Sequence, residues 1–220
     1  MLKSYQRNKG WTAVGMDMSM TSIAVTAVSW DAVLKKMSDV AYGEIRWTPE
    51  HDYFTRILEA AKCHRLLVDV LLQTWGMDYE RVAIAVEEPF PLGMVARHTF
   101  QASWIKQQSE VAGAAKGSLL RYGFKNIYEI NNSQWKATLR REGITIRKMP
   151  DGKWDVKEWA IAALGLPDIP DLVKSKSGML IVRPEHGFGA KAKPAQPSDI
   201  YDAAAVMAWM QDEILSGRVW

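Results

Sequence analysis

Alternating apolar and polar positions predict a β-rich first half of the chain. Residues 11–17 and 22–28 both favour β-strands and are joined by a short polar turn, so they predict an antiparallel hairpin. Residues 40–47 predict a third strand. Residues 81–86 form an unbroken apolar run, which is typical of a strand covered on both faces. The pattern therefore predicts a sheet with at least one deeply buried strand.

Helical spacing dominates the remainder of the chain. Apolar residues three and four positions apart predict one long helix between 51 and 75. Its apolar stripe consists of Phe54, Ile57, Leu58, Ala61, Val68, Leu71, Leu72 and Trp75. Further helices are predicted over 99–122, from 134 onwards, over 153–164 and over 199–215.

A fifth strand and a long loop complete the order of elements. Residues 126–130 predict the strand, and the polar cluster at 131–133 predicts the N-cap of the helix that follows. The stretch 167–198 is rich in proline, glycine and lysine and has no sustained period, which predicts a long basic loop. The order of elements predicts a single α/β domain over 1–220, with a mixed sheet flanked by helices on both faces.

Composition limits the classes of function. The chain has 220 residues, a single cysteine and a net charge of +3, which excludes internal disulfides and cysteine-built metal sites and permits a nucleic-acid partner. No run of about 18 apolar residues occurs, so no membrane partner is expected, and the basic N-terminus lacks a signal-peptide stretch. We therefore expect a cytoplasmic protein. The sequence contains neither a P-loop nor a Gly-x-Ser-x-Gly elbow, which excludes the enzymes built on those motifs.

Four acidic residues stand where the local pattern disfavours charge. Asp17 and Glu87 each end an apolar strand. Asp199 and Asp202 lie three residues apart in the first turn of the last predicted helix, so they share one face. Adjacent strand ends with a helix docked across them would gather these carboxylates, and Mg²⁺ or Mn²⁺ would offset their repulsion. Taken singly, Asp17 also fits a turn, and Asp199 and Asp202 fit an ordinary helix start.

Three motifs occur in a fixed order along the chain. Residues 15–25 read GMDMSMTSIAV, residues 85–90 read AVEEPF, and residues 199–206 read DIYDAAAV. They resemble the first-strand motif, the fourth-strand motif and the closing helix of the RuvC-type Holliday-junction resolvases, which are members of the ribonuclease-H-like superfamily. Each motif is weak alone, and the three together are fairly specific.

This resemblance implies a function and a set of site residues. It implies a metal-dependent endonuclease that resolves Holliday junctions or other branched DNA by paired nicks, in the cytoplasm of a bacterium or a phage-infected host. The implied ligands of two Mg²⁺ or Mn²⁺ ions are Asp17, Glu87, Asp199 and Asp202. Lys136 and Lys153 resemble the family's two lysines, one after the fifth strand and one opening the next helix. Each also fits a solvated helix lysine.

DNA is expected to be held mainly through its phosphates. The expected DNA-binding residues are Phe90, Lys136, Arg140, Arg141 and Lys153, with further phosphate contacts from Arg147, Lys148 and the basic loop. Phe90 follows the second acid by three residues, so a base unstacked at the junction could stack on it. Packing of the same ring against the end of the core is the open alternative.

Other functions and the mode of association stay open at this point. A ribonuclease H or flap-type nuclease would use the same chemistry on another substrate. An actin-like nucleotide-binding protein shares the core topology, and a non-catalytic junction binder could share the fold. A homodimer is expected because a junction needs two opposed nicks. The small-residue face of Ala112, Ala115 and Leu119 is its candidate contact, unless that face packs on the sheet.

Overall fold

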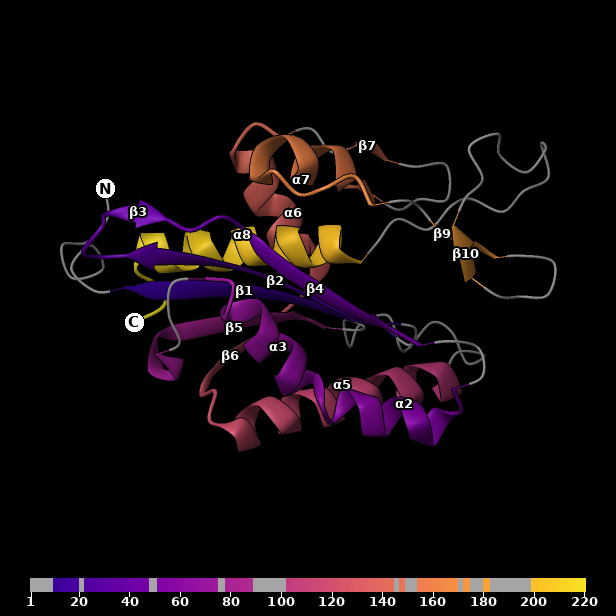
Figure 1. The fold of residues 1–220 in the computed structure, drawn as a ribbon. Coiled ribbons are helices and arrows are strands. Elements are labelled where there is room, and N and C mark those ends of the chain that lie inside the picture. The colour runs from indigo at the N-terminus through magenta and orange to yellow at the C-terminus, as the bar shows by residue number, and fades with distance from the viewer. Residues whose placement is uncertain are drawn as a thin grey trace.

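A six-stranded sheet lies at the centre of the computed structural model (Figure 1). The structure describes residues 10–19, 22–47, 51–74, 78–88, 102–144, 147–148, 154–169, 172–174, 180–182 and 199–220. The strands of the sheet are β1 (Trp11–Met18), β2 (Ser22–Asp31), β3 (Lys36–Met37), β4 (Ala41–Arg46), β5 (Val82–Glu87) and β6 (Asn126–Ile130). Their order is β3-β2-β1-β5-β6, and β4 pairs with β2.

The strands of the sheet run in both directions. β1 and β2 form the predicted antiparallel hairpin, whereas β1, β5 and β6 are parallel. Met16 of β1 lies opposite Val86 of β5. This register brings the residues that follow them, Asp17 and Glu87, to the same end of the sheet. The predicted mixed sheet is confirmed.

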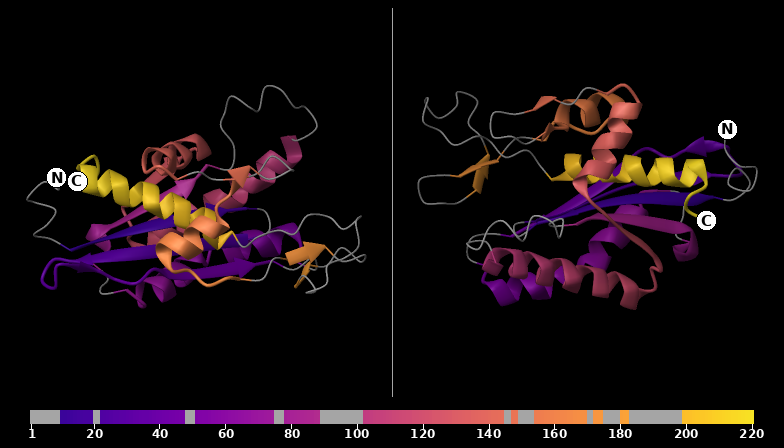
Figure 2. Two further views of the ribbon diagram at one scale, coloured as in Figure 1. Left: turned by 90° about the horizontal axis from the view of Figure 1, so that it is seen from above. Right: turned by 180° about the vertical axis from the view of Figure 1, so that it is seen from behind.

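Helices cover both faces of the sheet, as predicted (Figures 1 and 2). One face is covered by α8 (Ile200–Ser216), on which α6 (Asn132–Arg141) and α7 (Lys157–Leu164) pack in turn. The other is covered by α2 (Tyr53–Ala60), α3 (Cys63–Leu71) and α5 (Ala102–Tyr122), and a 3₁₀ turn, η1 (Tyr79–Arg81), precedes β5. Within the described residues, no helix is long and apolar enough to cross a membrane.

The alternation of β1 and β5 gives the two faces of the sheet different side chains. Small residues face α8, among them Ala13 and Gly15 of β1 and Ala83 and Ala85 of β5. Large aliphatic residues face α3 and α5: Val14, Met16, Met18, Val82, Ile84 and Val86. The two acids, Asp17 and Glu87, therefore continue the small-residue side of their strands.

Gly15 allows α8 to approach the sheet closely. A Cβ atom on Gly15 would lie 2.1 Å from the carbonyl oxygen of Ala203 and 2.2 Å from the backbone nitrogen of Met207. Both are backbone atoms of α8, which cannot move aside as the end of a side chain can. The first turn of α8 is thereby held against the carboxyl end of β1.

The long helix predicted over 51–75 is instead two helices, α2 and α3, separated by a turn at 61–62. The predicted stripe is also wrong in part, because Phe54 and Leu58 are 73% and 62% exposed. Small residues occupy the buried side at the junction: Ala60 and Cys63 are fully buried, and the Cys63 thiol donates to the Ala115 carbonyl at 3.2 Å. Small residues here let α2 and α3 pack closely on α5, and the larger side chains are left outside.

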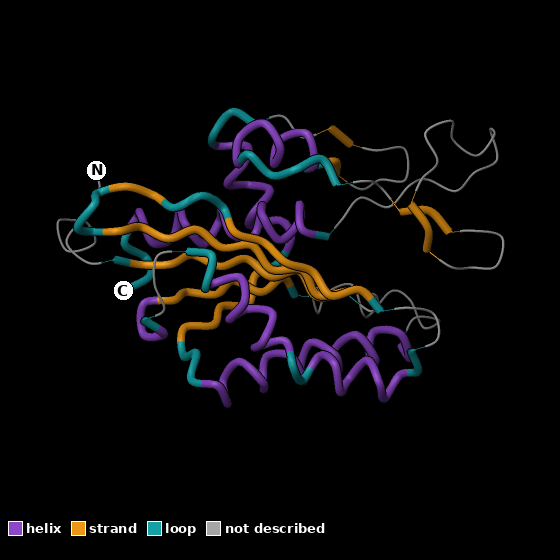
Figure 3. The backbone as a smooth tube through the Cα atoms, in the orientation of Figure 1, coloured by secondary structure: helices purple, strands orange, loops and turns teal. Residues whose placement is uncertain are grey.

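Two other predicted boundaries differ from the structure. The helix expected from 153 begins at Lys157, after a short antiparallel pair formed by β7 (Arg147–Lys148) and β8 (Trp154–Asp155). The segment expected to be a loop contains a second antiparallel pair, β9 (Leu172–Lys174) and β10 (Leu180–Val182), which is visible away from the sheet in Figure 3. Both pairs have strands of two or three residues, too short for a periodic signal.

The small-residue face considered for a dimer contact packs inside the protein. Ala112, Ala115 and Leu119 of α5 are at most 1% exposed and belong to the core between α5 and the sheet. The alternative that this face packs on the sheet is therefore confirmed, and these residues are not available to a second copy.

Candidate metal centre

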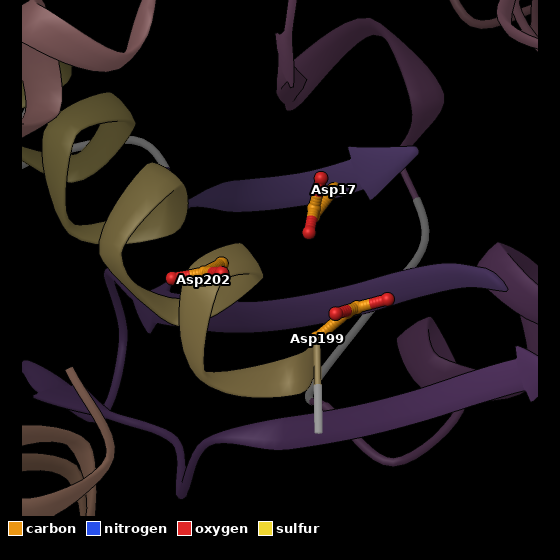
Figure 4. Close-up of side chains that lie close together, drawn as sticks. All are labelled: Asp17, Asp199 and Asp202. Atoms are coloured by element: carbon orange, nitrogen blue, oxygen red, sulfur yellow. The ribbon is translucent and has the colours of Figure 1, made fainter. Parts of the chain in front are cut away.

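Three aspartates meet where α8 begins over the end of β1 (Figure 4). Asp17 is the penultimate residue of β1, Asp199 is the N-cap of α8, and Asp202 lies in the first turn of α8. One carboxylate oxygen of each lies within 4.8 Å of the other two. The structure thus brings together three of the four predicted ligands from segments more than 180 positions apart in the sequence.

The electrostatics of this cluster favour a bound cation. Burial raises the pKa of Asp17 well above its ordinary value, and the neighbouring charges of Asp199, Glu87, Asp202 and Glu44 raise it further. Like charges gathered in a buried place disfavour ionisation, whereas a divalent cation favours it. Carboxylate oxygens are the ligands that Mg²⁺ and Mn²⁺ prefer, so the donor set fits these ions.

Glu87, the fourth predicted ligand, stands at the end of β5 beside this cluster but outside the group of three. Burial raises its pKa to about 7; a hydrogen bond from Trp135 and the charge of Lys136 lower it, and the charge of Asp199 raises it. The Trp135 indole nitrogen donates to Glu87 Oε2 at 3.1 Å. Glu87 is therefore held in an orientation next to the three aspartates.

Lys136 of α6 lies near two of the acids, Glu87 and Asp202. The helix is anchored at its start by a capping box, in which the Asn131 side chain accepts from the Ser133 backbone and Gln134 accepts from the Asn131 backbone. The predicted N-cap is confirmed. Burial lowers the pKa of Lys136, while the charges of Glu87 and Asp202 raise it. The ammonium group is thus close enough to the acids to be coupled to them.

The other predicted DNA-binding residues differ in their surroundings. Arg140 is exposed on α6, and its charge lowers the pKa of Lys136, which places it beside that lysine. Arg141 donates to Asp212 and to Thr138, both at 2.9 Å, and so links α6 to the second half of α8. Phe90 and Lys153 lie outside the described residues.

Two residues that sequence reasoning missed surround Asp199. The hydroxyl of Ser22, at the start of β2, donates to Asp199 Oδ2. Glu44 of β4 accepts a hydrogen bond from the Asp199 backbone at 3.2 Å and forms an ion pair with Arg46 at 2.9 Å. The available signal was a pair of opposite charges two positions apart in the strand predicted over 40–47, which is β4 in the structure. Glu44 and Arg46 point to the same side of this strand.

A hollow among the described residues lies away from this cluster. It is lined by Trp11, Trp30, Asp78 and Arg81, at the opposite end of β1 from Asp17. It contains none of the predicted site residues. The chemistry-bearing residues are instead grouped in the acid cluster under the start of α8.

Comparison with known proteins identifies the fold. No protein-family model matches the chain, and no curated protein sequence matches it significantly. Among solved structures, the chain is similar to T. thermophilus RuvC in complex with a Holliday junction substrate, with a TM-score of 0.54 and 17% identity over 94% of this chain and 96% of that one. An Aquifex aeolicus member of the Ppx/GppA family gives a TM-score of only 0.31 at 10% identity, over 87% of this chain and 52% of that one.

The likeness to RuvC establishes the architecture. A mixed sheet with helices on both faces and a closing helix over its acidic end is the ribonuclease-H-like fold of RuvC, as the sequence motifs predicted. The fold is thus common to both proteins over nearly their whole lengths.

Proposed function

We propose that the chain is a metal-dependent endonuclease that resolves four-way DNA junctions or other branched DNA by paired nicks. The acid cluster carries this proposal, because carboxylates that gather Mg²⁺ or Mn²⁺ on this fold suit phosphodiester hydrolysis. Similarity to RuvC, whose solved structure contains a Holliday junction substrate, supports branched DNA as the substrate class.

The cluster offers ligands for two divalent cations. Asp17, Asp199 and Asp202 would hold one ion among them, and Glu87 would extend the set for a second. Bound there, Mg²⁺ or Mn²⁺ would stabilise the negative charge that develops on the attacking and leaving oxygens of the scissile phosphodiester. The fold supplies the ligands from β1, β5 and α8, so their positions depend on elements that the core fixes.

The protein's own cations complete the proposed site. Lys136, coupled to Glu87 and Asp202, would contact a non-bridging phosphate oxygen and balance its charge. Arg140 is exposed one turn further along α6, where it would contact the neighbouring phosphate of the backbone. We also propose that Lys153 is a second catalytic lysine and that the ring of Phe90 stacks on a base.

Resolution of a junction requires two nicks on opposed strands. A four-way junction has approximate two-fold symmetry, so two copies of the site related by a two-fold axis suit it. We therefore propose that the active form is a homodimer. Its interface lies outside the buried face of Ala112, Ala115 and Leu119.

A panel of labelled nucleic acids tests the proposed substrate. End-labelled four-way junctions, Y-shaped DNA, flaps and RNA–DNA hybrids are incubated with the full chain in Mg²⁺ or in EDTA. We expect paired, metal-dependent nicks in the four-way junction and slower cutting of the other substrates. If the hybrid or the flap is cut preferentially, that nucleic acid, and not the four-way junction, is the substrate. ATP binding without any cleavage would overturn the nuclease assignment.

Two neighbouring glutamates provide a matched pair of variants. Glu87→Gln keeps the shape of the side chain but removes a ligand charge, so we expect cleavage to fall by at least ~10²-fold. Glu88→Gln makes the same change one residue later, past the end of β5, and should cut at close to the wild-type rate. Equal rates for all three proteins in single-turnover assays would remove Glu87 from the site.

A further inference from the structure

Trp135 contacts the candidate metal centre through its indole nitrogen. The residue lies in the first half of α6 and is only 3% exposed, within the core between α6 and α8. Its Nε1–H donates to Glu87 Oε2 at 3.1 Å. The donor sits on a ring fixed by packing, and the acceptor is a candidate metal ligand on another element, β5.

The face of the same indole contacts Lys136. The Lys136 Nζ atom lies 4.9 Å from the centre of the Trp135 ring. Consecutive residues of a helix project in different directions, so the lysine side chain must bend back across the ring to reach this position. One side chain thus touches both the anionic ligand Glu87 and the cation that is coupled to it.

The indole nitrogens of three other tryptophans allow a comparison. The indole nitrogens of Trp30, Trp47 and Trp159 are buried without an acceptor among the described residues. Within the described part of the chain, the protein therefore tolerates buried indole N–H groups that have no acceptor. The Trp135 N–H, in contrast, has an acceptor, and this acceptor is a carboxylate of the candidate centre.

We propose that Trp135 is a positioning residue that orients Glu87 for metal binding and holds Lys136 beside it. This inference rests on the proposed function. A glutamate side chain has several rotatable bonds, and a donor fixed on one oxygen leaves the other oxygen directed for a cation. Hydrogen-bond partners of metal ligands change metal affinity by about 10- to 100-fold when they are removed.

Mn²⁺ binding to the full chain, measured by calorimetry without DNA, tests the role of the N–H group. Trp135→Phe keeps a buried aromatic ring and removes the donor, so we expect Mn²⁺ to bind about 10-fold more weakly. Trp47→Phe is the matched control, since Trp47 is 4% exposed and its N–H has no acceptor among the described residues. Both variants create a similar void, and only Trp135→Phe should change the affinity for Mn²⁺.

A double variant shows whether the effect passes through Glu87. In a Glu87→Gln background, Trp135→Phe should weaken Mn²⁺ binding by less than 2-fold. An equal loss in both backgrounds, or wild-type affinity in Trp135→Phe, would overturn the inference. Absence of Mn²⁺ binding in the wild type would instead contradict the proposed metal-dependent function, so the two failures are distinguishable.

A measurement on the folded wild type covers the case in which Trp135→Phe does not fold. The indole N–H resonance of Trp135 is followed by two-dimensional NMR as Mg²⁺ is added. We expect this resonance to shift with Mg²⁺, and to move to a different position in Glu87→Gln. A resonance that responds to neither change would overturn the inference.

Discussion

The two faces of the central sheet are built from the same strands but have different roles. Toward α3 and α5, β1 and β5 present large aliphatic side chains such as Met16 and Ile84, which are fully buried. Toward α8, the same strands present Gly15 and Ala85 and then Asp17 and Glu87. The first face buries large apolar side chains. The second face has small side chains, which allow α8 to lie close to the two acids. In β1 and β5, the even-numbered positions thus contribute to stability through apolar burial, and the odd-numbered positions carry the acids of the candidate centre.

This division has an energetic consequence. Burial of large aliphatic side chains stabilises the fold. Gathering carboxylates under α8 destabilises the protein without a cation, as the raised pKa values of Asp17 and Glu87 indicate. The positive N-terminus of α8 offsets part of this cost at Asp199 and Asp202. The α8 side should therefore respond to charge changes and to metal, and the α5 side should not.

The largest expected effect comes from neutralising Asp17. Asp17→Asn removes a ligand charge, so we expect junction cleavage to fall by ~10³-fold or more. Because the variant also removes a buried like charge, the metal-free protein should be more stable by about 1–3 kcal/mol at pH 8. Asp69→Asn, on the exposed side of α3, should change neither property. If Asp17→Asn cleaves the junction at nearly the wild-type rate, the α8 face of the sheet does not carry the active site.

The next effect concerns the close approach of α8. Gly15→Ala places a Cβ atom within 2.2 Å of backbone atoms in α8, and we expect a loss of ~3 kcal/mol or more in the free energy of unfolding. Gly43→Ala is the control on the α3 side, where the new atom meets the ends of the Leu66 and Val70 side chains at 2.8 and 3.0 Å. These ends can move, so the loss should be about 1 kcal/mol. Urea unfolding measures the stability of both variants. Equal losses in Gly15→Ala and Gly43→Ala would contradict the closer approach of α8 to the sheet.

The third effect is the pH dependence of the metal-free protein, and its size is comparable with the stability loss expected for Gly15→Ala. The pKa of Glu87 rises from 4.5 to about 7 on folding, so the folded state binds more protons in this range. The free energy of unfolding should therefore fall by on the order of 3 kcal/mol as pH rises from ~4.5 through ~7. Asp17 acts in the same direction.

Unfolding in EDTA at pH 5 and pH 8 measures this change. Glu87→Gln should show a weaker loss of stability with pH than the wild type, and Glu88→Gln should follow the wild type. Saturating Mg²⁺ binds the ionised carboxylates and should abolish the loss. The same pH dependence in wild type and Glu87→Gln would show that Glu87 does not titrate in a buried place.

Much of the candidate centre was predictable because its signals are local. A strand that ends on an acid identifies Asp17 and Glu87, and a three-residue spacing in a helix start identifies Asp199 and Asp202. The N-cap of α6 was equally predictable, since capping depends on a few consecutive residues.

The residues that were missed act through tertiary contacts. Ser22 and Glu44 reach Asp199 only because β4 pairs with β2 and α8 crosses above them. Trp135 reaches Glu87 only because α6 follows β6, the strand that pairs with β5, and packs on α8. The break between α2 and α3 was missed for a similar reason: its sequence contains no glycine or proline, and close packing on α5 decides which side is buried.

Anomalous diffraction from crystals of the protein soaked in Mn²⁺ tests directly whether the three aspartates bind a divalent cation. We expect an anomalous peak among the carboxylates of Asp17, Asp199 and Asp202, and its loss in Asp17→Asn crystals soaked in the same way. A wild-type crystal with no peak at this cluster at saturating Mn²⁺, or with Mn²⁺ bound only elsewhere, would contradict this expectation.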